Sequence, residues 1–176
     1  MAQPRIDMIA ASLERLDARL PDVPVDQLLI MRLILLLAHD FDVMLVHHIR
    51  PFGLGEGEFR VLTALFSQPQ GIAHPTELCS RASQSPANMS RIADALVQRD
   101  LITRDSSALD RRRLVLRITA HGEQLVRNLL PSIFAAVRRI FDTMAAAQQQ
   151  EMIAQIKSLA THLDAVTKAT AAEPGI

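Results

Sequence analysis

Apolar residues recur at steps of three and four positions over most of the chain, which is the spacing of one face of an α-helix. This pattern predicts a first amphipathic helix over residues 6–20 and a longer, more apolar helix from Gln27 to about Arg50 that ends near Gly53. Farther along, it predicts one helix from about residue 120 past 144 and a last helix over residues 152–166. Both ends of the chain are therefore expected to be helical.

The middle of the chain predicts three shorter helices. Gly55 can cap the first, and Pro75 fits the first position of the second. Ser85 and Pro86 begin the third, because serine is favoured as an N-cap and proline as the residue that follows it. The residues expected to face the core of these helices are Phe59, Leu62, Leu65 and Phe66, then Leu78, Cys79 and Ala82, then Met89, Ile92, Ala93 and Leu96.

Two short segments have the character of β-strands. Residues 101–104 are short and apolar, and residues 114–118 alternate with a period of two. The loop DSSALDRRR joins them, and Thr119 is placed to cap the next helix. Short helices followed by strand, loop and strand are typical of a winged helix-turn-helix. We predict a mainly α fold of the α+β winged helix-turn-helix class with a two-stranded wing, divided into N-terminal dimerisation helices (1–50), a DNA-binding domain (51–118) and C-terminal dimerisation helices (119–176).

The outer helices carry more apolar surface than one copy of the chain can bury. Their apolar seams favour a two-fold homodimer, which would cover both copies at once. The most apolar run, LLIMRLILLLA, spans about 16 Å as a helix, against roughly 30 Å of bilayer core, so no membrane partner is expected. Cys79 is the only cysteine, and the first residues lack the apolar core of a signal peptide, so we expect a cytoplasmic protein.

Charge is unevenly distributed along a chain whose net charge is zero. Residues 81–120 contain eight arginines and four aspartates, so this window carries an excess of four positive charges. Three of the arginines, Arg111 to Arg113, are consecutive in the loop between the two predicted strands. A basic middle segment suits contact with a polyanion such as double-stranded DNA.

Two motifs carry a resemblance to a known family. SRIADALVQRDLITR and DRRRLVLRITAHG resemble the recognition helix and wing of the MarR family of bacterial transcription regulators, with an Asp, an Arg two residues later, an alternating strand, a Thr and a Gly. HPTELCSRASQSPANMSRIADAL and LLIMRLILLLAHDF are similar to the EmrR/MprA branch, which represses multidrug efflux pumps. The resemblance covers about residues 28–163. It departs at Asp100, where the family usually has Gly, so we expect a left-handed backbone there with some strain.

The resemblance and the helix pattern together predict which residues meet DNA. The N-terminal end of a recognition helix enters the major groove, which places Ser85, Ala87, Asn88, Ser90 and Arg91 near base edges and phosphates. Arg91 suits guanine and Asn88 suits adenine.

The wing residues are expected to meet the minor groove and the phosphates. Arg112 matches the family position that enters the minor groove, where negative potential is focused. Asp110 is expected to pair with an arginine and to hold the shape of the wing, and Arg111 and Arg113 to meet phosphates.

The resemblance also implies a small hydrophobic or aromatic effector, bound between the dimerisation helices and the winged domain. The candidate lining residues are Phe41, Met44, His47, His48, Arg50, Phe59 and Met89. A metal site is not expected, because adjacent histidines on a helix point about 100° apart and do not chelate together. No cofactor is expected.

Three alternatives stay open beside the DNA-binding repressor. One is a redox-sensing regulator of the same family that works through Cys79. In family members that sense oxidants, the sensing cysteine lies near the start of the long dimer helix. Cys79 lies elsewhere and is expected to be a buried structural thiol. The basic loop could instead serve a helical interaction module that binds an acidic protein. An enzyme is disfavoured because the chain has none of the motifs G-x-S-x-G, P-loop or G-x-G-x-x-G.

Overall fold

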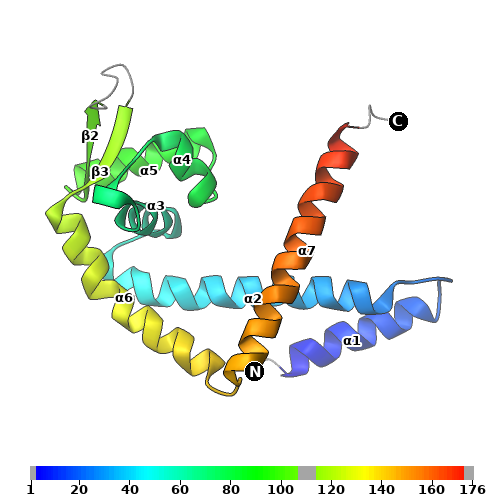
Figure 1. Cartoon of the computed structure of the whole chain (residues 1–176). Coiled ribbons are helices and arrows are strands. Elements are labelled where there is room, and N and C mark those ends of the chain that lie inside the picture. The colour runs from blue at the N-terminus through cyan, green and yellow to red at the C-terminus, as the bar shows by residue number, and fades with distance from the viewer. Residues whose placement is uncertain (1–2, 107–113, 173–176) are drawn as a thin grey trace. The chain divides into compact units, whose positions relative to one another are not determined.

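The computed structural model describes residues 3–106 and 114–172 (Figure 1). The chain forms two compact units, residues 1–133 and residues 134–176, and each is described separately. Among the described residues, no helix has the length and apolar character needed to cross a membrane. Asp110, Arg111, Arg112 and Arg113 lie outside the described residues.

The first unit begins with a helical hairpin. Helices α1 (Gln3–Asp17) and α2 (Val25–Ile49) lie side by side and antiparallel (Figure 1). A guanidinium nitrogen of Arg5 pairs with a carboxylate oxygen of Asp40 at 2.8 Å. Both helices were predicted, although α1 ends before residue 20. The helix α2 passes into a short 3-10 turn, η1 (Arg50–Phe52), which ends at Gly53 with a φ of 67°.

Three helices then form the body of the winged part. They are α3 (Glu56–Phe66), α4 (Pro75–Arg81) and α5 (Pro86–Gln98), and a 3-10 turn, η2 (Pro69–Gly71), lies between α3 and α4. The predicted starts are confirmed. Gly55 is the N-cap of α3, and its N–H donates to the Glu58 carboxylate at 2.8 Å. Ser85 caps α5 by accepting a hydrogen bond from the Asn88 N–H at 3.3 Å.

A small antiparallel sheet completes the winged part. Its strands are β1 (Ile72–Ala73), β2 (Ile102–Ser106) and β3 (Leu114–Ile118), in the order β1-β3-β2. The predicted two-stranded wing is confirmed as the hairpin β2–β3, and β1 is a further strand of the sheet that was not predicted. In β1, Ile72 pairs with Arg117 and Ala73 with Leu116. A two-residue strand has no periodicity, so its pattern could not be seen in the sequence.

One apolar core holds these elements together. It contains most of the predicted inward positions of α3, α4 and α5, together with strand residues and the start of α6 (Ala120–Phe141). The predicted core residues Phe59, Phe66 and Cys79 are only half-buried at its edge, whereas Val61, which was not predicted, is fully buried. The core fixes α5 against the sheet, and it therefore fixes which face of α5 reaches solvent.

The junction between the wing and α6 explains the Thr–Gly part of the motif. The Thr119 hydroxyl accepts from the Gly122 N–H at 3.0 Å and donates to the carbonyl of Asp100 at 2.7 Å, so the predicted cap is present. Asp100 has a φ of 53°, which confirms the predicted left-handed backbone. A Cβ at Gly122 would overlap the carbonyl oxygen of Leu101, so only glycine allows α6 to start this close to β2.

Helix α6 contains Pro131 and ends at Phe141. It is shorter than predicted, because the sequence pattern had extended it past residue 144. The second unit contains the end of α6 and α7 (Ala146–Ala172), which confirms the predicted last helix. The predicted apolar seam of α7 is exposed within the described chain: Met152, Ile156, Leu159, Leu163 and Val166.

Candidate nucleic-acid interface

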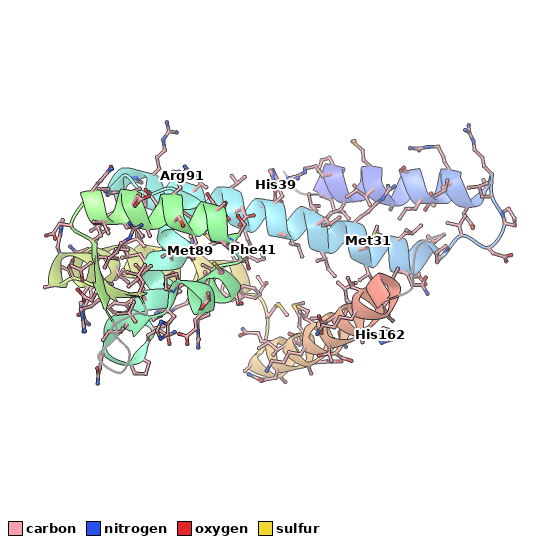
Figure 2. All side chains as sticks on the ribbon, turned by 90° about the horizontal axis from the view of Figure 1, so that it is seen from above. Met31, His39, Phe41, Met89, Arg91 and His162 are labelled. Carbon is pink, nitrogen blue, oxygen red and sulfur yellow. The ribbon has the colours of Figure 1, made fainter. Side chains whose placement is uncertain are left out.

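The first two turns of α5 present polar side chains to solvent. Ser85, Ala87, Ser90 and Arg91 are exposed and Asn88 is half-buried. Met89 is only 2% exposed and packs into the core, on the opposite side of α5 from Arg91 (Figure 2). Of the predicted residues, Asn88 and Arg91 lie together on one side of the helix, whereas Ser90 borders the apolar residues Met89 and Ala93.

A chain of side-chain hydrogen bonds runs along this side. Nε and Nη2 of Arg91 donate to Oδ1 of Asn88 at 3.3 Å and 2.8 Å. Nδ2 of Asn88 donates to Oε1 of Gln84, and Nε2 of Gln84 donates to the carbonyl of Ala82 at 3.0 Å. Arg91 is therefore oriented by the protein before any ligand is present. Gln84 was not among the predicted residues.

Two arginines anchor α5 to the rest of the unit. Arg99 donates to the carbonyls of Gly53 at 2.7 Å and Phe52 at 2.9 Å, which ties the end of α5 to the turn after α2. Arg104 on β2 pairs with Asp94 of α5 at 2.7 Å and donates to the carbonyl of Ser90 at 3.4 Å. Both arginines counted toward the predicted basic segment, yet their guanidinium groups bind within the protein.

The base of the wing has its own ion pair. Nε of Arg117 on β3 pairs with Oδ2 of Asp105 on β2 at 3.1 Å, and the Thr103 hydroxyl donates to the same carboxylate oxygen at 3.3 Å. These contacts hold β2 and β3 together next to the wing tip. The tip residues Asp110 to Arg113 lie outside the described residues, so their DNA contacts stay predictions.

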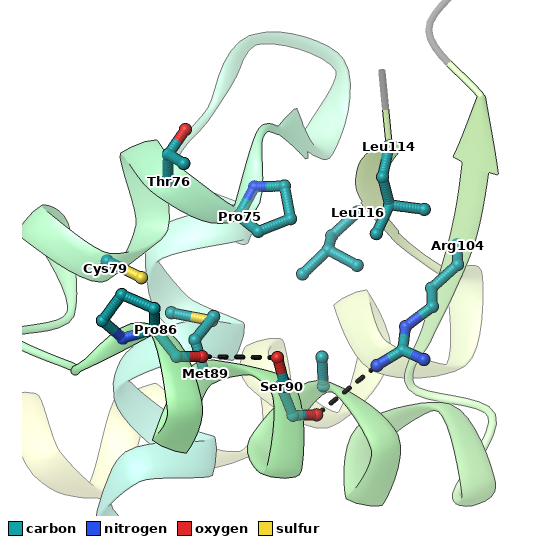
Figure 3. A pocket seen from close by; sticks show the side chains of 10 residues that line it. Pro75, Thr76, Cys79, Pro86, Met89, Ser90, Arg104, Leu114 and Leu116 are labelled. Carbon is teal, nitrogen blue, oxygen red and sulfur yellow. Dashed lines mark hydrogen bonds between the residues drawn. The ribbon is translucent and has the colours of Figure 1, made fainter. Parts of the chain in front are cut away.

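An apolar cavity of about 290 Å³ lies between α4, α5 and the wing strands (Figure 3). Cys79 was expected to be a buried structural thiol, but it is half-buried and lines this cavity. The reason is its place on the short helix α4, where Leu78 takes the inward position. The other lining residues are Pro75, Thr76, Pro86, Met89, Ser90, Ala93, Arg104, Leu114 and Leu116.

A second, more polar hollow of about 450 Å³ lies between the start of α3 and α5. The predicted DNA-binding residues Asn88 and Arg91 form part of its wall. Gln84 also lines it, so the hydrogen-bonded chain follows the edge of this hollow.

The predicted effector residues are spread over three helices and the turn η1. Phe41, Met44, His47 and His48 lie on α2, Arg50 begins η1, Phe59 lies on α3 and Met89 on α5. Of these seven, only Met89 lines one of the two cavities described above. The rings of His47 and His48 meet edge to face with centroids 5.5 Å apart. In the described part of the chain, no group of three or more His, Cys, Asp or Glu side chains is placed to hold a metal ion.

Comparisons with known proteins bear on this interface. Residues 52–113 match the model of the MarR family. The chain is 27% identical over 147 residues to the transcriptional repressor MprA of Escherichia coli K12, and the match covers 84% of each chain.

Solved structures share the fold. One is Sco3205, a MarR family transcriptional regulator from Streptomyces coelicolor in complex with DNA, with a TM-score of 0.72 and 22% identity over 80% of this chain and 89% of that one. Another is CouR from Rhodococcus jostii RHA1 bound to p-coumaroyl-CoA, with a TM-score of 0.68 and 21% identity over 74% of this chain and 91% of that one.

Proposed function

We propose that the chain, part of which matches the MarR family model, is a homodimeric transcriptional repressor that binds a pseudo-palindromic operator in double-stranded DNA. The observation that carries the proposal is the exposed polar side of α5, on which Arg91 is held in place ahead of binding. In this fold the N-terminal end of such a helix enters the major groove, and the wing reaches the neighbouring minor groove. Arg112 is the proposed minor-groove contact.

The proposed homodimer is supported by the apolar surface that the chain leaves uncovered. On α2, Ile30, Leu35 and Leu37 are each more than half exposed, and α7 presents its whole seam. Apolar surface of this extent on helices is typical of an interface between copies. In this proposal residues 1–50 and 119–176 dimerise, and residues 51–118 bind DNA.

We further propose that a hydrophobic or aromatic effector releases the DNA. CouR, which has this fold, was solved with p-coumaroyl-CoA. The proposed lining is the predicted set: Phe41, Met44, His47 and His48 of α2, Arg50 of η1, Phe59 of α3 and Met89 of α5. The effector must bind the DNA-free conformation more tightly than the DNA-bound one, or it shifts nothing. Similarity to MprA favours a multidrug efflux operon as the target.

The test is selection of sites from a random duplex pool by the purified protein at about 150 mM salt, where nonspecific phosphate contacts are weakened. We expect an enriched two-fold symmetric site with half-sites about one helical turn apart. Arg91→Ala and Arg112→Ala should weaken binding to that site while sedimentation still reports a dimer. A pool that stays random would contradict the proposal and favour the interaction module that binds an acidic protein.

A further inference from the structure

We propose that Gln84 and Asn88 are positioning residues that present Arg91 to a guanine, so that each half-site is read through guanine at this point and Asn88 does not read adenine. The inference rests on the proposed function, because it needs α5 in the major groove. It differs from the adenine contact that the residue type of Asn88 suggested.

The direction of the hydrogen-bonded chain is fixed at its inner end. The carbonyl of Ala82 can only accept, so the Nε2 group of Gln84 must face it, at 3.0 Å. Oε1 of Gln84 is then left for Nδ2 of Asn88, and Oδ1 of Asn88 for Arg91. Gln84 and Asn88 are both half-buried, so water competes less for these bonds than at an exposed site. Each amide therefore has one orientation, set by a backbone group that the side chains cannot change.

The N–H donors of Arg91 that remain free indicate which base it reads. A guanidinium group has five N–H donors, and Asn88 Oδ1 accepts one from Nε and one from Nη2. Among the described residues, no other hydrogen bond or ion pair engages Arg91. The edge formed by Nη1 and Nη2 therefore keeps its two parallel donors. Guanine offers two acceptors at that spacing, O6 and N7, so this pair can form without breaking any bond of the chain.

Asn88, in contrast, could pair with adenine only by breaking hydrogen bonds of the chain. To pair with adenine, its Oδ1 must accept from N6 and its Nδ2 must donate to N7. Oδ1 already accepts twice from Arg91, and Nδ2 is directed at Gln84. An adenine contact would therefore require at least one of the Arg91 bonds to Oδ1 to break first, because that oxygen has only two lone pairs. A contact that needs no rearrangement is favoured over one that does, because its groups are preorganised.

The experiment measures the affinity of the full chain for the selected operator and for operators with each base substituted at every half-site position. For the wild-type protein we expect one guanine in each half-site whose replacement weakens binding about tenfold or more. Asn88→Ala and Gln84→Ala should each reduce this discrimination several-fold. Gln84→Glu should reduce it as well, because a carboxylate has no N–H to donate to the carbonyl of Ala82, and its added negative charge lowers affinity for all sequences alike.

The matched control is Gln98→Ala, which removes an exposed glutamine at the other end of α5 and should leave discrimination unchanged. Circular dichroism melts of all variants check that each is folded. An adenine preference that disappears in Asn88→Ala while the guanine preference stays would overturn the inference and leave the repressor intact. Discrimination that survives in both alanine variants would also overturn it. A wild-type pool that stays random would instead overturn the proposed function, and this inference with it.

Discussion

Asp100 holds the left-handed backbone directly after α5, at a φ of 53°. A residue with a Cβ is strained in this region, and aspartate is less strained than most. The turn is retained because the carbonyl of Asp100 accepts from the Thr119 hydroxyl and its N–H donates to the carbonyl of Val97. The strain is therefore localised at one side chain and can be removed by one substitution.

Asp100→Gly should raise the free energy of unfolding by about 0.5–1 kcal/mol, because glycine adopts this conformation without a steric penalty. Urea denaturation followed by circular dichroism measures the change. Gln98→Gly is the control, since it places glycine in the last helical residue of α5, and it should lower stability by about the same amount. A destabilised Asp100→Gly variant would show that the aspartate side chain makes a compensating contact.

Gly122→Ala should lower the free energy of unfolding by about 1–3 kcal/mol, because the added Cβ meets the backbone carbonyl of Leu101, which cannot rotate away. The same denaturation experiment measures it. His121→Ala, an exposed change one residue earlier in α6, is the control and should be nearly neutral. Equal stability of the two variants would mean that α6 shifts at little cost.

Residues with local signals could be predicted from the sequence, and residues with distant partners could not. Gly55, Ser85 and Thr119 were predicted as caps because a cap is defined within four residues of its helix. Arg99 was not, because its partner carbonyl on Gly53 lies 46 positions away. The Gln84–Asn88–Arg91 chain has helical spacing, but its direction is set by the backbone carbonyl of Ala82, which no spacing rule specifies.

At the scale of elements, the contact between β2 and α5 fixes the wing strands relative to α5, the proposed recognition helix. Arg104 makes it by pairing with Asp94 at 2.7 Å. An exposed ion pair contributes little to stability, roughly 0–1 kcal/mol. In the proposed function its importance lies in orientation, because α5 and the wing would both have to reach DNA at once.

Asp94→Ala should weaken operator binding several-fold, although it removes a negative charge close to the proposed DNA surface. Charge alone predicts tighter binding, because removing a negative charge lessens the repulsion between the protein and the DNA phosphates. Fluorescence anisotropy with the selected operator distinguishes the two by the sign of the change. Asp142→Ala, which removes an aspartate from the second unit, serves as the control for net charge. Tighter binding by Asp94→Ala would show that the pair does not position the wing.

The helices and the β2–β3 hairpin were predictable because each repeats a period over several residues. Strand β1 was not predictable, because its two residues form a strand only by pairing with β3, which is distant in the sequence. The predicted core was right where a residue takes the innermost position of its helix, as Leu78 and Leu96 do. It failed for neighbours of such positions, among them Cys79, which follows the fully buried Leu78 on the seven-residue helix α4.

At the scale of the whole molecule, the exposed seam of α7 predicts association between copies. Leu163 is 62% exposed, and Thr161 lies two residues earlier, on roughly the opposite side of the same helix. Leu163→Glu should shift the protein from dimer to monomer in sedimentation velocity at micromolar concentration. Thr161→Glu adds the same charge and should leave the dimer intact. If both variants sediment as dimers, α7 lies outside the interface.

Cys79 gives the molecule a single-site reporter. It is the only thiol of the chain, it lines the cavity between α4, α5 and the wing, and the chain has neither tryptophan nor tyrosine. A dye or nitroxide attached there would give its signal without protein background. The rate at which thiol reagents react with this sulfur measures how accessible it is in the cavity. Docking of α5 on an operator would then register as a change in the labelling rate of one atom.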